Sequence, residues 1–174
     1  MSFEQVAGRI WGMDKGEIKQ SWKWDYDVKK FKFVDEVLDF AISREIDARN
    51  FYVKLAGLVE KPQMVKVLSD LAAEELEHKA KLEAVKAGKV EIGDQEVGKL
   101  DVVDYVKDVE LHPKMNYAEL LVVGMKKEET SRKLYADLAA IVQRQELKDI
   151  FLKLAQEEAK HKLRFEFEYD LMTF

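Results

Sequence analysis

Residues 71–83, LAAEELEHKAKLE, place a glutamate and a histidine inside a segment whose leucines and alanines have the spacing of an amphipathic α-helix. Glu75 and His78 are three residues apart, so their side chains share one helix face. A carboxylate and an imidazole that face a core are unfavourable unless another charge compensates them. The pattern therefore indicates that this face either meets water or holds a cation.

The same pattern occurs a second time, 83 residues later, as LAQEEAKHKLRFE at 154–166. Residues 41–83 align with 124–166 without a gap, and 13 of the 43 aligned positions are identical. A match at one fixed offset is typical of a duplicated structural unit. The identical pairs include Glu45/Glu128, Tyr52/Tyr135, Leu55/Leu138, Glu75/Glu158 and His78/His161.

Apolar residues recur with a helical period in four segments, which predicts helices at about 33–59, 62–87, 117–142 and 145–172. Pro62 suits the first turn of the second helix, and Gly88 follows its end. Asn116 and Glu119 predict a capping box at the start of the third helix. The joints within each pair of helices are only a few residues long, so each pair is expected to be an antiparallel hairpin.

These elements predict an all-α fold, a four-helix bundle of two antiparallel hairpins joined by a long crossover. The bundle domain spans 33–174, with the crossover at 88–115, where three glycines and Pro113 interrupt any long helix. Residues 1–32 hold all three tryptophans and are expected to form an arm or short helix that covers the bundle.

The four matched glutamates lie near the midpoints of the four predicted helices, which places them at one level of the bundle. Carboxylates that meet in a core cannot all ionise without a counter-charge. Two divalent cations balance four carboxylates, and two neutral imidazoles complete the set used by ferritin-like dimetal carboxylate bundles. The predicted metal ligands are Glu45, Glu75, His78, Glu128, Glu158 and His161.

A single Glu-x-x-His motif is ordinarily a solvated helix face, and the duplication is what favours metal binding here. His112 has no matched partner and is interpreted as a loop residue. Glu74 and Glu157 are either surface charges or hydrogen-bond partners that orient the histidines. Tyr52 and Tyr135, each seven residues after a lone glutamate, are either core residues or catalytic residues near the metals; neither can touch its own glutamate.

The composition narrows the range of functions. A net charge of −5 and a pI near 5.4 argue against a nucleic-acid partner. The absence of cysteine excludes disulfides, thiolate zinc sites, iron–sulfur clusters and thiol catalysis. The chain has neither a secretory signal pattern nor a membrane-spanning run, so a cytoplasmic protein without a membrane partner is expected.

At the predicted ligands the sequence resembles the rubrerythrin branch of the ferritin-like superfamily, over about residues 34–172. The motifs that carry the resemblance are EIDARNFY at 45–52, EELEH at 74–78, EETSRKLY at 128–135 and EEAKH at 157–161. The resemblance implies a ferritin-like four-helix bundle in which Glu75 and Glu158 bridge two irons. It also implies that Glu45 and His78 complete the ligands of one iron, and Glu128 and His161 those of the other.

Two departures from the family pattern bear on activity. Rubrerythrins typically carry a cysteine-ligated rubredoxin domain that feeds electrons to the iron pair, and this sequence has no cysteine. They also usually have an extra glutamate three residues after the third-helix ligand, where this sequence has Ser131. The remaining six-ligand set is like that of bacterioferritin, and it argues against a rubrerythrin-type peroxidase cycle.

The leading functional hypothesis is a non-haem diiron protein that reacts reduced iron with dioxygen or hydrogen peroxide, as an oxidoreductase in oxidative-stress or iron handling. An external electron donor, or ferrous iron itself, would supply the electrons. Three alternatives stay open: a dimanganese enzyme similar to manganese catalases, non-enzymatic iron binding or delivery, and a structural bundle with an unused site. A homodimer is expected, whereas a ferritin-type storage shell is not.

Overall fold

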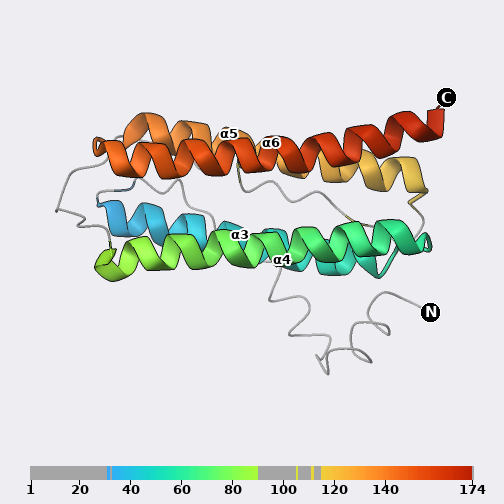
Figure 1. Cartoon of the computed structure of the whole chain (residues 1–174), viewed down its shortest axis with the longest axis horizontal. Helices are drawn as coiled ribbons and strands as arrows, with labels where there is room; N and C mark the ends of the chain where they lie inside the picture. Colours follow the sequence, from blue (N-terminus) through green and yellow to red (C-terminus); the bar gives the residue numbers. More distant parts are fainter. Residues whose placement is uncertain (1–30, 32, 90–104, 106–110, 112–114, 174) are drawn as a thin grey trace, which may run out of the picture.

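The computed structural model describes residues 31, 33–89, 105, 111 and 115–173, and these form four long α-helices. They are α3 (Val34–Ala56), α4 (Pro62–Ala84), α5 (Tyr117–Ile141) and α6 (Gln145–Thr173). Helix α3 packs mainly on α4, and α5 mainly on α6, so the two predicted hairpins are confirmed. Figure 1 shows the hairpins lying side by side, with all four helices running along the long axis.

The helix ends follow local signals in the sequence. Pro62 occupies the first turn of α4. The α4 helix continues into a π-helical turn, Val85–Lys89, in which Gly88 has a φ of 77°, a left-handed conformation that glycine adopts without strain. At the start of α5, the backbone N–H of Glu119 donates to Asn116 Oδ1 at 3.0 Å, and the backbone N–H of Asn116 donates to Glu119 Oε2 at 2.7 Å. These two hydrogen bonds are those of the predicted capping box.

The sequence-based helix limits differ from the structure at one joint. The first helix was expected to reach residue 59, but α3 ends at Ala56, and Gly57 is its C-cap. The predicted arm at 1–32 lies outside the described residues except for Phe31. Most of the 88–115 crossover, including His112, lies outside them as well. Among the residues that the structure describes, none of the helices combines the length and the apolar composition of a membrane span.

A layer of charged side chains divides the hydrophobic core into two clusters. The first cluster combines the start of α3, the end of α4, the end of α5 and the start of α6, with Leu38, Leu82, Leu138 and Leu154 among its members. The second combines the opposite halves of the same helices, with Leu55, Leu68, Leu121 and Phe165. The order is reversed on alternate helices because neighbours in each hairpin are antiparallel, and every helix therefore crosses the charged layer near its midpoint.

Close packing in the second cluster depends on a glycine. A Cβ atom at Gly124 of α5 would lie 2.6 Å from the ring of Phe165, which is fully buried. The same ring stacks on Tyr52 of α3, with the ring centroids 6.1 Å apart. Gly124 therefore lets an aromatic side chain of α6 reach across the bundle to the first hairpin.

Candidate metal centre

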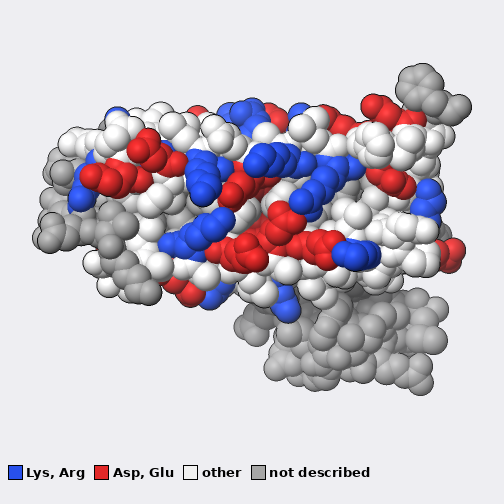
Figure 2. All heavy atoms as spheres, in the orientation of Figure 1, with Lys and Arg blue, Asp and Glu red and all other residues white. Residues whose placement is uncertain are grey.

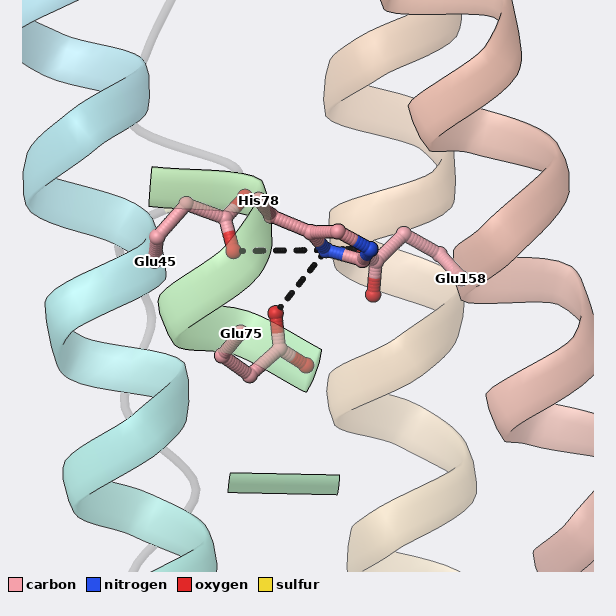
Figure 3. Close-up of side chains that lie close together, drawn as sticks. All are labelled: Glu45, Glu75, His78 and Glu158. Atoms are coloured by element: carbon pink, nitrogen blue, oxygen red, sulfur yellow. Dashed lines mark ion pairs between the residues drawn. The ribbon is translucent and has the colours of Figure 1, made fainter. Parts of the chain in front are cut away.

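The six predicted ligands come together in the charged layer. Each is only 1–2% exposed, and with Arg44 they are the buried charged or imidazole side chains among the residues described. Their ligand atoms form two groups, and within each group one ligand atom from every residue lies within 4.8 Å of the others. The first group consists of Glu45, Glu75, His78 and Glu158, and the second of Glu75, Glu128, Glu158 and His161. Figure 3 shows the first group, in which side chains from α3, α4 and α6 point toward one another.

Glu75 and Glu158 belong to both groups and divide their oxygens between them. Glu75 places Oε2 3.3 Å from His78 Nδ1 and Oε1 3.4 Å from His161 Nδ1. Glu158 places Oε1 3.2 Å from His78 Nδ1 and Oε2 3.6 Å from His161 Nδ1. Each central carboxylate thus faces two positions with one oxygen each, which is the geometry of a carboxylate that bridges two cations.

Glu45 and Glu128 each belong to one group only. Glu45 Oε2 lies 3.6 Å from His78 Nδ1, and Glu128 Oε2 lies 3.5 Å from His161 Nδ1. The two imidazole rings are nearly parallel, with an interplanar angle of 11° and centroids 5.6 Å apart. The internal repeat of the sequence therefore appears in space as two similar half-sites, one served by His78 and the other by His161.

Most of the ligand atoms in this layer lack a hydrogen-bond partner among the described residues. They are Glu45 Oε2, both carboxylate oxygens of Glu75 and of Glu128, Glu158 Oε1, and Nδ1 of both histidines. Buried polar atoms are normally satisfied, and a concentration of buried carboxylate oxygens and imidazole nitrogens without well-directed hydrogen bonds is what a cation-binding site presents. The donor set of carboxylate oxygens and imidazole nitrogens fits two divalent transition metal ions.

Outside the ligands, each histidine contacts a glutamate of the other hairpin. His161 Nε2 on α6 lies 3.0 Å from Glu74 Oε2 on α4, and His78 Nε2 on α4 lies 2.9 Å from Glu157 Oε2 on α6. A neutral imidazole that donates from Nε2 keeps the lone pair of Nδ1 directed at the metal position. Of the two interpretations given to Glu74 and Glu157, the structure favours partners that orient the histidines.

Known proteins resemble this chain in sequence and in fold. The family model described as Rubrerythrin matches residues 36–169, about three quarters of the chain. The chain belongs to the rubrerythrin family. A hypothetical protein from Pyrococcus furiosus is 28% identical in sequence, with a TM-score of 0.60 over 80% of this chain and 89% of that one. No curated protein matches the chain.

Charges in this rubrerythrin-family site shift the pKa values of its groups in opposite directions. Burial raises the pKa of Glu45 and of Glu128 well above the ordinary value of a glutamate. Burial also raises the pKa of Glu75 and Glu158, but the two histidines outweigh it and hold both values below the ordinary one. Burial lowers the pKa of His78, yet the surrounding carboxylates, Glu158 first, raise it to about 12.

His161 follows the same pattern, since Glu128, Glu158 and Glu75 outweigh burial and raise its pKa far above the ordinary value. In the metal-free protein, protons on the imidazoles therefore supply the positive charge that the buried carboxylates require. Binding of metal has to displace these protons, because only a neutral imidazole can be a ligand.

The two candidate catalytic tyrosines are buried on either side of the ligand layer. Tyr52 stacks on Phe165 and Tyr135 stacks on Phe151, each pair with centroids 6.1 Å apart. Neither tyrosine hydroxyl has a hydrogen-bond partner among the described residues. Buried tyrosine hydroxyls usually find a partner, so these two remain candidates for contacting a ligand or water, and the sequence expectation stays a prediction.

Sequence reasoning missed three cations around this rubrerythrin-type layer. Arg44 is 7% exposed, pairs with Asp47, and lies over the ring of Phe40. Lys81 and Arg164 contact Glu157 and Glu74, respectively. The repeat carried a signal for all three, because each aligned pair, Arg44 with Lys127 and Lys81 with Arg164, is basic in both copies.

Proposed function

We propose that this rubrerythrin-family chain is a non-haem diiron-carboxylate protein that reacts reduced iron with dioxygen or hydrogen peroxide. The observation that supports the proposal is the division of the Glu75 and Glu158 oxygens between two half-sites, each completed by one further glutamate and one histidine. Six ligands shared in this way suit two metal ions held close together rather than one.

Bound iron would supply one electron per ion, so a ferrous pair can reduce one hydrogen peroxide to two waters with uptake of two protons. The chain's own groups set the conditions for this chemistry. Glu75 and Glu158, whose oxygens face both half-sites, would hold the two ions close together, and Nδ1 of His78 and of His161 would each supply a nitrogen ligand. The apolar clusters on both sides exclude bulk water, and Tyr52 and Tyr135 are the candidates for proton delivery.

The electron source and the metal belong to the proposal as well. The sequence has no cysteine to hold a rubredoxin iron, so an external donor or ferrous iron itself supplies the electrons. Iron is favoured over manganese because the family match is to rubrerythrin. Metal analysis of protein purified from its native host tests this choice directly, and a predominance of manganese would favour the catalase-like alternative.

The test of the proposal is anaerobic loading of metal-free protein with Fe(II), followed by addition of hydrogen peroxide or air. We expect two irons per chain and rapid growth of the near-ultraviolet absorption of an oxidised iron pair. Glu75→Ala should abolish the signal, whereas Glu77→Ala, which removes an exposed carboxylate from the same turn of α4, should retain it. Two bound irons that stay ferrous with peroxide would overturn the redox proposal.

Repeated additions of peroxide with a chemical reductant distinguish an enzyme from an iron-binding protein. Multiple turnovers per iron pair support the enzymatic proposal. Oxidation that stops after one equivalent per pair would instead favour iron binding or delivery.

A further inference from the structure

Two chains of polar contacts lead from the surface to the histidines. In one, Glu74 accepts from His161 Nε2 on Oε2 at 3.0 Å and from Arg164 Nη1 on Oε1 at 2.7 Å. In the other, Glu157 Oε2 lies 2.9 Å from His78 Nε2 and 3.1 Å from Lys81 Nζ. The alignment of the two halves relates the chains to each other, since 74, 78 and 81 correspond to 157, 161 and 164.

Both chains cross the seam between α4 and α6. Each cation lies three residues after its histidine on the same helix, and both reach a glutamate on the opposite helix. The Lys81 and Arg164 side chains are 44% and 43% exposed, so the cations lie at the surface above the buried ligands. Figure 2 shows this face, where acidic side chains between α4 and α6 are flanked by lysine and arginine.

The two chains differ in how firmly they hold the inner glutamate. Glu74 uses a different oxygen for each partner, so rotation of its carboxylate would disturb both contacts. Both contacts that the structure gives Glu157 use the single oxygen Oε2. An arginine also forms a more pre-organised ion pair than a lysine, whose ammonium group is compact and strongly hydrated. Each chain contains one carboxylate and one cation, so the difference lies in rigidity rather than in charge.

We propose that Arg164 and Lys81 are positioning residues that rank the two metal positions, so that the position served by His161 binds its ion more tightly than the position served by His78. The ranking rests on the proposed dimetal site. An imidazole already fixed with Nδ1 toward the metal loses less freedom when it binds. Loss of the direct partner of a ligating histidine, here Glu74 or Glu157, typically weakens metal affinity by about 10–100-fold, so loss of the cation that holds this partner should weaken it by less.

Calorimetric titration of the metal-free full-length protein with Co(II) tests the ranking. We expect two resolved binding steps, with Arg164→Gln weakening the tighter step by up to about 10-fold and Lys81→Gln weakening only the other. The exchanged variant, Lys81→Arg with Arg164→Lys, should bring the two affinities together or reverse them. Lys66→Gln is the matched control, because Lys66 pairs with Asp70 on the outer face of α4 and contacts no ligand partner.

Two further variants assign the steps. Glu45→Gln should remove the weaker step, because Glu45 contacts only the His78 position, and Glu128→Gln should remove the tighter one. A second readout follows the metal-free protein by nitrogen NMR. Exchange of the His161 Nε2 proton with water should be slower than that of His78, and Arg164→Gln should accelerate it at His161 alone.

The possible results distinguish the proposed dimetal site from the proposed ranking of its two positions. A wild-type chain that binds fewer than two Co(II) ions overturns the proposed site and the ranking with it. Two ions that bind with equal affinity, or variants that weaken both steps alike and change proton exchange at both histidines, overturn the ranking alone. Two steps that respond separately to Arg164 and Lys81 support it.

Discussion

Glu75 on α4 and Glu158 on α6 face each other in the charged layer, and each directs one oxygen toward His78 and the other toward His161. The two residues therefore differ from Glu45 and Glu128, which contact one half-site each. A substitution at Glu75 or Glu158 should therefore affect both metal positions, whereas one at Glu45 or Glu128 should affect only one.

Loss of a shared glutamate should remove both metal ions, whereas loss of a terminal one should remove a single ion. We expect Glu75→Ala and Glu158→Ala to bind fewer than one Co(II) per chain under conditions in which Glu128→Ala binds about one. Saturating metal should raise the melting temperature of the wild type, since a ligand at 1,000 times its Kd stabilises by about 4 kcal/mol, and leave Glu75→Ala nearly unchanged. Equal stoichiometry in all variants would contradict the shared role.

The stability of the metal-free protein should fall as the pH rises above about 6.5. His78 and His161 have raised pKa values in the folded state, His78 to about 12, so the folded protein keeps protons that the unfolded chain loses above pH 6.5. Each proton that the folded state keeps and the unfolded chain loses lowers the free energy of unfolding by up to about 1.4 kcal/mol per pH unit. Urea unfolding of metal-free protein at pH 6 and pH 9 measures this slope.

Glu45 and Glu128 have raised pKa values and act in the same direction, because the folded state holds their protons above the pH at which the unfolded chain releases them. Glu45→Gln should therefore flatten the fall in stability of the metal-free protein between pH 5 and pH 8. Metal should reverse the trend with pH, since bound ions replace the protons and affinity rises as protons are lost. Parallel pH profiles with and without metal would contradict this account.

Gly124→Ala should destabilise the bundle by about 1–3 kcal/mol, the usual penalty for overpacking. The added Cβ would lie 2.6 Å from the Phe165 ring, which has no exposed side on which to move. In the first half of the repeat, the matched positions hold Ala41 and Leu82. The double variant Gly124→Ala with Phe165→Leu should therefore be more stable than the sum of the single effects predicts, as measured by a double-mutant cycle in urea.

Tyr52→Phe should leave the metal-free protein as stable as the wild type or stabilise it by up to about 1 kcal/mol, because it removes a buried hydroxyl without a partner among the described residues. If the hydroxyl delivers protons, the same variant should slow oxidation of bound Fe(II) by peroxide without changing the iron stoichiometry. Tyr135→Phe is the matched comparison in the second half of the repeat. A variant that oxidises iron at the wild-type rate would leave Tyr52 a core residue.

The sequence predicted those parts of the molecule that depend on periodicity within one helix. The spacing of apolar residues identified the buried faces, and the repeat placed the six candidate ligands on them at matched depths. Pro62, Gly88 and the Asn116 capping box located helix ends, because those signals act within a few residues.

Features that depend on the packing of one helix against another were not predictable in the same way. The contact of Glu74 with His161 depends on the register of α4 against α6, which belong to different hairpins. The close approach of Gly124 to Phe165 depends on the register of α5 against α6 within one hairpin. Periodicity says which face a residue occupies, but it does not say which residue of a neighbouring helix lies opposite. The end of α3 at Ala56 differed from the prediction for a local reason, since Gly57 and the following residues turn toward α4.

Neither hairpin carries a complete metal position, because the group around His78 needs Glu158 and the group around His161 needs Glu75. A single hairpin of this kind would have to associate with a second copy of itself before it could hold a pair of ions. Because one chain supplies both halves, the halves can differ in sequence, as Lys81 and Arg164 do, while the shared carboxylates Glu75 and Glu158 are identical.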